Sequence, residues 1–123
     1  MSDKLDKMFD LRARFMKKLQ SAGKEMPDWP VDVTDKHNQL FIKDVLYHGM
    51  EELFEALREL KNAKKHRQTD IPEFDKEHFL EEMVDAHNLF LEALVLVGVS
   101  PQEFFDAYVK KDGTINRRID EKY

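Results

Sequence analysis

Two short segments of the sequence carry carboxylates at a spacing that suits metal binding. The first reads HGMEELFEALRELKN (48–62) and contains the pattern E-E-x-x-E at 51–55. The second reads FLEEMVDAHNLFLEAL (79–94) and contains E-E-x-x-D at 81–85. Residues three and four positions apart share one face of a helix. Each segment is therefore predicted to present several carboxylates along a single stripe.

Two such stripes facing each other would repel strongly. Helices joined by a short connection pack antiparallel, and two like charges about 4 Å apart at an effective dielectric near 20 repel by about 4 kcal/mol. The cluster tolerates this if it is open to water, protonated, or neutralised by a cation. Carboxylate oxygens suit a hard ion such as Mg²⁺ or Mn²⁺. The alternative is an ordinary solvent-facing acidic surface on each helix.

Composition limits the other possibilities. The chain has 123 residues, which is the size of one domain, and a formal net charge of −5. An acidic chain is poorly suited to nucleic acid, where affinity comes largely from Lys and Arg. The absence of cysteine excludes disulfides, zinc–thiolate sites and cysteine nucleophiles. No signal-like or membrane-spanning apolar run is present. We therefore expect a cytoplasmic protein with neither a nucleic-acid nor a membrane partner.

Apolar periodicity predicts an all-α fold, a bundle of four to five helices. We expect helices at 3–22, 36–63 and 76–97, with Ser2, Thr34 or Asp35, and Asp75 as their respective N-caps. A fourth helix begins after Ser100, which forms a capping box with Glu103. The polar connection 62–75, with its basic run 64–67, links the second and third helices. The polar tail 112–123 is expected to be loosely ordered.

Two apolar features of these helices bear on assembly. A stripe on the second helix at spacings of four and three is predicted to face the core: Leu46, Met50, Leu53, Leu57 and Leu60. On the third helix, residues 89–97 are apolar on every side except at Glu92. A helix of that kind must be surrounded, and we expect an oligomer interface to cover it.

The paired acidic motifs resemble the ExxE…ExxD signature of the all-α nucleoside triphosphate pyrophosphohydrolases, the superfamily that contains MazG and the dimeric dUTPases. The resemblance extends to the first 20 residues, which are similar to the opening helix of the dUTPase-like branch, and to the helix after Ser100 with its basic tail. It thus covers most of the chain. It implies a MazG/dUTPase-type bundle assembled as a homodimer or homotetramer.

The resemblance also implies a reaction and the residues that perform it. The substrate would be a (deoxy)nucleoside triphosphate, hydrolysed to monophosphate and pyrophosphate with Mg²⁺ or Mn²⁺, in nucleotide-pool sanitation or shaping. The implied metal ligands are Glu52, Glu55, Glu82 and Asp85. Of these, Glu52 and Glu55 would be catalytic, with Glu55 orienting the attacking water. The expected substrate-binding residues are Asn88, Lys111, Asn116, Arg118, Glu51 and His48. The first helix slightly favours dUTP, with purine dNTPs such as dGTP and dATP close behind.

Two other functions fit the same sequence. One is a non-enzymatic helical dimer that acts as an adaptor or regulator through its apolar third helix. The other is an enzyme of the same type acting on a different diphosphate compound, such as phosphoribosyl-ATP.

Overall fold

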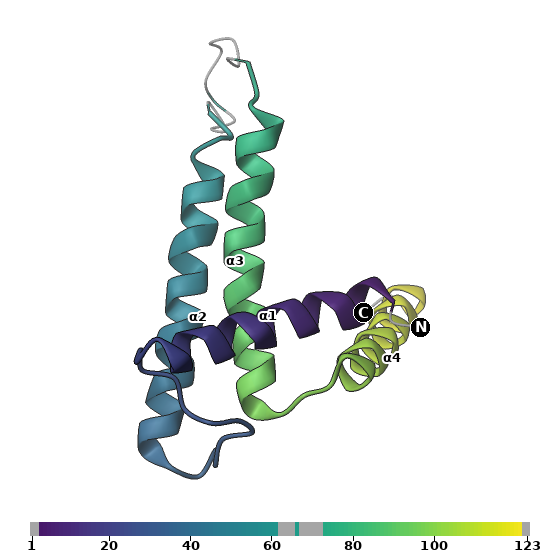
Figure 1. The fold of residues 1–123 in the computed structure, drawn as a ribbon. Coiled ribbons are helices and arrows are strands. Elements are labelled where there is room, and N and C mark those ends of the chain that lie inside the picture. Colours follow the sequence, from purple (N-terminus) through teal and green to yellow (C-terminus); the bar gives the residue numbers. More distant parts are fainter. Residues whose placement is uncertain (1–2, 62–65, 67–72, 122–123) are drawn as a thin grey trace. The chain divides into compact units, whose positions relative to one another are not determined.

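The computed structural model is all-α, and its described residues form four helices (Figure 1). These are α1 (Lys4–Ser21), α2 (Lys36–Leu57), α3 (Lys76–Val97) and α4 (Pro101–Asp120). The structure describes residues 3–61, 66 and 73–121, so most of the predicted connection 62–75, including all of its basic run except His66, lies outside the described residues. Within the described part of the chain, no single helix could cross a membrane, and α3 and α4 reach the required length and composition only as a bent pair.

The chain divides into two compact units. Unit 1 joins Met1–Val31 to Leu94–Tyr123, and unit 2 comprises Asp32–Ala93. The α3 helix begins in unit 2 and ends in unit 1. Because one continuous helix belongs to both, the units are not two successive domains, and the single-domain interpretation stays a prediction.

The helix starts follow local hydrogen bonding, as the sequence indicates. Ser100 caps α4 through the predicted capping box. Asp35 accepts hydrogen bonds from the first-turn amides of α2, and Asp75 accepts one from the amide of His78 in α3. The α1 helix differs from the prediction, because Asp3 rather than Ser2 is its N-cap and forms a capping box with Asp6.

Two helix ends differ from the prediction. The α2 helix ends at Leu57 rather than at 63, and the next residues form tighter turns in which Arg58, Glu59 and Leu60 each donate to the carbonyl three residues earlier. At the other end of the chain, residues 112–120 are not loosely ordered but continue α4 to Asp120. Their polar side chains are compatible with a helix because several bond within it. The Asn116 amide, for example, donates to the Asp112 carbonyl at 2.9 Å.

In unit 1, α1 packs against α4, and the chain after α1 folds back on it. The rings of Phe9 and Phe104 lie 6.3 Å apart. The Lys17 ammonium lies 4.5 Å from the centre of the Trp29 ring, a favourable cation–π geometry. The Val31 amide donates to the Leu96 carbonyl at 2.9 Å, which ties this loop to the end of α3.

In unit 2, α2 and α3 lie side by side and antiparallel (Figure 1). Two contacts show the antiparallel direction. Gly49 in α2 lies against Phe90 in the second half of α3, whereas Glu59, just after α2, bonds His78 at the start of α3. The buried residues of α2 are Val45, Gly49 and Ala56. Small side chains at these positions permit a close approach of the two helices.

The predicted core stripe of α2 is wrong for the single chain. Met50, Leu57 and Leu60 are 45–51% exposed, and Leu46 is also classed as exposed. The physical reason is that the small residues described above, rather than the leucines, face α3. In the apolar part of α3, Leu89, Leu91, Ala93, Val95 and Leu96 are buried within the chain, whereas Val97 is exposed. The expected oligomer interface on α3 stays a prediction. Within the described part of the chain, four of the five residues of the predicted α2 stripe are exposed, and Leu53 is half-buried.

The two glycines inside helices offer a matched test of the α2–α3 contact. A Cβ atom added at Gly49 would lie 2.8 Å from Cε1 of Phe90, whereas one added at Gly113 would meet nothing within 4 Å. Replacing a mid-helix glycine by alanine gains up to about 1 kcal/mol of helix propensity, but overpacking costs about 1–3 kcal/mol. We expect Gly113→Ala to raise the free energy of unfolding in urea and Gly49→Ala to lower it. Equal stabilisation by both changes would contradict the close contact.

Candidate metal centre

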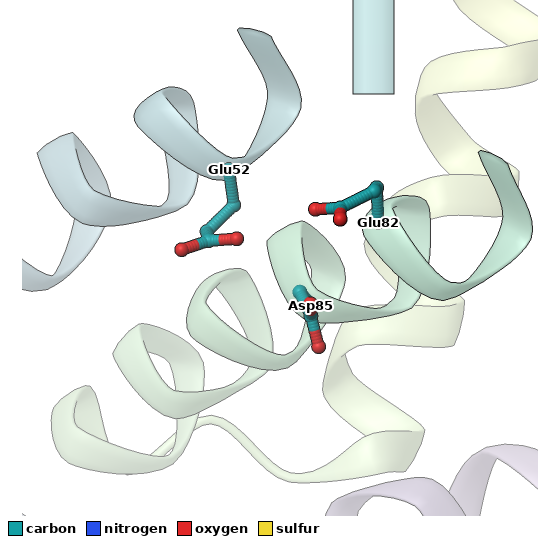
Figure 2. A group of neighbouring side chains, drawn as sticks. All are labelled: Glu52, Glu82 and Asp85. Carbon is teal, nitrogen blue, oxygen red and sulfur yellow. The ribbon is translucent and has the colours of Figure 1, made fainter. Parts of the chain in front are cut away.

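Three carboxylates of the two acidic motifs converge between α2 and α3. Glu52 extends from α2, and Glu82 and Asp85 extend from α3. Each offers one oxygen, and these three oxygens all lie within 4.8 Å of one another. Figure 2 shows the Glu82 carboxylate directed toward Glu52 across the helix pair. The antiparallel register produces this arrangement, because it sets residue 52 opposite 85 and residue 55 opposite 82.

Glu82 is the least solvated member of the cluster. Its side chain is 16% exposed, and within the described part of the chain its Oε2 atom is buried without a hydrogen-bond partner. Burial is the main cause that raises the pKa of Glu82, and a hydrogen bond with Glu55 and the charges of Glu55 and Asp85 raise that pKa further. Two carboxyl groups can share a hydrogen bond only when one of them is protonated. The protonated form of Glu82 is therefore favoured more than in a solvent-exposed glutamic acid.

His78 lies at one end of the cluster and contacts both its own helix, α3, and the turn after α2. Its Nε2 atom lies 3.2 Å from Oε1 of Glu82, and its Nδ1 atom hydrogen-bonds Oε1 of Glu59 on the other side of the helix pair. The hydrogen bond to Glu59 is the largest cause that raises the pKa of His78, aided by the negative charges of Glu59, Glu82 and Asp75. A protonated imidazole here partly offsets the negative charge of the cluster.

His78 is not among the site residues predicted above, although the sequence contains a signal for it. The pattern H-x-x-E-E-x-x-(E/D) occurs twice, at 48–55 and at 78–85. In both copies the histidine contacts the second glutamate of the pair, one turn later: His48 Nε2 lies 3.2 Å from Oε1 of Glu52. The two acidic motifs are thus two copies of one local arrangement on antiparallel helices.

The other predicted residues of unit 2 lie around this cluster. Glu55 is outside the group of three converging carboxylates but contacts Glu82. Asn88 is half-buried on α3, one turn beyond Asp85, and Glu51 is exposed on α2. These positions leave the predicted roles untested.

The three predicted tail residues lie on α4 in unit 1, and their position relative to the cluster is not defined. Lys111 is exposed. The Asn116 amide is engaged within its own helix, where it donates to Asp112. Arg118 is half-buried and has an interaction partner. Their predicted contact with phosphate is therefore also untested.

A surface hollow adjoins the cluster. It has a volume of about 490 Å³ and is lined by residues of one face of α3: Glu77, Leu80, Glu81, Val84 and Asp85. This volume is within the range of small-molecule sites. Asp85 belongs to both the hollow and the cluster, so a ligand in the hollow would lie next to the converging carboxylates. Three of the five lining residues are acidic, so an anionic ligand would need a cation beside it.

Comparison of the chain with protein-family models, with curated proteins and with solved structures found no match. The chemical properties of the cluster must therefore be judged from its own donor set. Three carboxylates, one of which has a buried oxygen without a donor, fit a hard divalent cation. Because Mg²⁺ keeps several waters and binds through one or two carboxylates plus substrate phosphates, such a site also leaves positions for a phosphorylated ligand.

Proposed function

We propose that this protein is a divalent-metal-dependent nucleoside triphosphate pyrophosphohydrolase of the all-α MazG/dUTPase-like type. The observation that supports this best is the convergence of Glu52, Glu82 and Asp85 within 4.8 Å. Like charges at this separation are costly in a partly buried site. The buried Oε2 atom of Glu82, which has no donor in the described part of the chain, is an acceptor that a cation would satisfy.

In this proposal, Mg²⁺ or Mn²⁺ would be held by Glu52, Glu82 and Asp85, with Glu55 beside them. The ion would supply charge neutralisation at the triphosphate and at the oxygens of the transition state. Glu55 orients the attacking water and accepts its proton, a role that suits its exposed position and its contact with Glu82. The water oxygen forms a bond to the α-phosphorus, and the bond from that phosphorus to the bridging oxygen of the β-phosphate breaks. The products are a nucleoside monophosphate and pyrophosphate.

The hollow beside Asp85 is the proposed location of the nucleotide. Its apolar residues Leu80 and Val84 offer contact to a base or sugar, while its acidic residues oppose bare phosphate. Asn88 would bond a ribose hydroxyl or a base edge, and His48 and Glu51 flank the site on α2. Lys111, Asn116 and Arg118 of α4 stay the phosphate contacts that the family resemblance implies. We favour deoxynucleoside triphosphates, with dUTP first and purine dNTPs next.

A panel experiment tests this function. The purified chain is incubated with each of the four common dNTPs and dUTP, with Mg²⁺ or Mn²⁺, and the products are separated by ion-exchange chromatography. We expect monophosphate and pyrophosphate in equal amounts from at least one substrate, and none after chelation of the metal. If no triphosphate in the panel yields a monophosphate, the proposed reaction is wrong.

A specific observation also favours self-association. Monomeric soluble proteins rarely expose large contiguous apolar patches, yet Met50, Leu57 and Leu60 of the α2 stripe are 45–51% exposed. We therefore propose that a second copy covers this stripe, in a homodimer or homotetramer. The same assembly without hydrolysis is the second candidate function, a helical adaptor or regulator.

Light scattering coupled to size-exclusion chromatography checks the assembly. We expect wild type to elute as a dimer or tetramer and Leu57→Glu to dissociate, because the change places a charge within the covered stripe. The control is Val33→Glu, which adds the same charge at an exposed position before α2. A monomeric wild-type protein would contradict the proposed assembly.

A further inference from the structure

The contacts of His78 set it apart from the other histidines near the cluster. One ring nitrogen lies 3.2 Å from Oε1 of Glu82 on its own helix, and the other hydrogen-bonds Glu59 in the turn that follows α2. The two carboxylates are largely buried, with side chains 15% and 16% exposed. The imidazole therefore connects α3 to the turn after α2, immediately beside the converging carboxylates.

This connection constrains how Glu82 can turn. A carboxylate has two equivalent oxygens, and rotation about its last bond exchanges them. With Oε1 held by His78, the other oxygen, Oε2, stays in the buried position where it has no donor among the described residues. His78 is itself held by Glu59. Glu59 therefore acts on the orientation of Glu82 through His78.

We propose that His78 is a positioning residue for the metal site: it fixes Glu82 so that one oxygen is presented to the cation. This inference rests on the proposed function, since it needs a cation at the cluster. The physical principle is general, because ligating carboxylates are themselves hydrogen-bonded and loss of such an outer partner weakens metal binding about 10–100-fold.

The second copy of the sequence pattern provides an internal comparison. His48 holds Glu52 at the same spacing and the same distance, 3.2 Å, and its side chain is 58% exposed against 49% for His78. Among the described residues, the hydrogen bond of His48 goes to Glu52 on its own helix, whereas His78 also bonds Glu59 in the turn after α2. Loss of the histidine should therefore matter more at position 78 than at position 48.

The test measures Mn²⁺ binding to the full chain directly, by the electron paramagnetic resonance signal of free Mn²⁺. We expect His78→Ala to weaken binding about 10–100-fold. His78→Gln, whose amide can still donate to a carboxylate, should recover most of the loss. His37→Ala, which removes an exposed histidine from the start of α2, is the matched control and should bind as wild type does. Circular dichroism melts establish that each variant is folded.

Glu59→Gln provides a second variant that leaves both His78 and Glu82 in place. It should weaken Mn²⁺ binding by itself but add little in the His78→Ala background, because the two residues act in series. This variant also decides the outcome if His78→Ala does not fold.

The results separate the two proposals. If wild type binds Mn²⁺ and His78→Ala binds it equally well or more tightly, the positioning role is wrong, and tighter binding would mean that His78 acts only as a competing positive charge. If wild type itself shows no saturable binding, the proposed metal-dependent function fails, independently of any His78 variant.

Discussion

Asp85→Asn and Glu82→Gln are each expected to reduce kcat/KM for triphosphate hydrolysis by about a thousandfold, while making the metal-free protein more stable. Metal-ion stabilisation of transition-state charge contributes several kcal/mol, and about 4 kcal/mol corresponds to that factor. The stability change has the opposite sign because each substitution removes one negative charge from a group of three within 4.8 Å. At Glu82 it also removes a carboxyl group whose pKa burial raises.

The two readouts together distinguish a functional cluster from an ordinary structural one. Residues kept for packing or hydrogen bonding lower stability when they are changed. Asp44→Asn is the matched control, since it removes one carboxylate from an exposed position of α2 and should change neither quantity appreciably. Full activity in Glu82→Gln, or a metal-free form less stable than wild type, would contradict the proposed role of the cluster.

The second large effect is a dependence of stability on pH that divalent metal reverses. The raised pKa of Glu82 means that its ionised form is penalised in the fold, and this penalty disappears as pH falls toward the unfolded-state pKa of about 4.3. The raised pKa of His78 means that its contribution to the free energy of unfolding is fully present below the unfolded-state pKa of about 6.5. This contribution is lost as pH rises through the folded-state pKa. Both shifts make the metal-free protein more stable as pH falls from about 8 to about 5.

A bound cation reverses this dependence of stability on pH, because it binds the ionised form of Glu82 and displaces the proton. Differential scanning calorimetry should therefore show Tm falling with rising pH in the presence of a chelator. The rise in Tm on adding Mn²⁺ should be larger at high pH than at low pH. Thr34 donates to Asp32 and lowers the pKa of that carboxyl. The contribution of Asp32 to stability is therefore lost only in more acidic solution, below the pH range of about 5 to 8 considered above. A metal effect that does not change with pH would contradict the involvement of Glu82.

The features that the sequence predicted correctly are determined locally. The α3 helix has the predicted bounds of 76–97, and Ser100 begins α4 as expected, because capping and helical periodicity depend on residues within one or two turns. The convergence of Glu52, Glu82 and Asp85 agrees with one of the two arrangements considered from the sequence, in which the acidic faces of two antiparallel helices lie opposite each other.

The features that were missed depend on which neighbour covers a helix face. Periodicity showed that α2 is amphipathic, but it did not show that Gly49 and Ala56, rather than Met50 and Leu57, face α3. The role of His78 depends on the register between the helices, which sets it opposite Glu59. The tail was expected to be loosely ordered because of its polarity, yet hydrogen bonds such as that from Asn116 to Asp112 are made within a regular helix.

The central claim is that Glu52, Glu82 and Asp85 bind a divalent cation, and paramagnetic NMR tests it at the level of residues. The assigned amide spectrum of the 123-residue chain is recorded while substoichiometric Mn²⁺ is added, with Mg²⁺ as the diamagnetic reference. We predict that line broadening is strongest for the amides around 52, 55, 82 and 85 and weakens along α2 and α3 in both directions. Broadening centred on another acidic surface, or spread evenly over the exposed carboxylates, would show that this cluster is not a metal site.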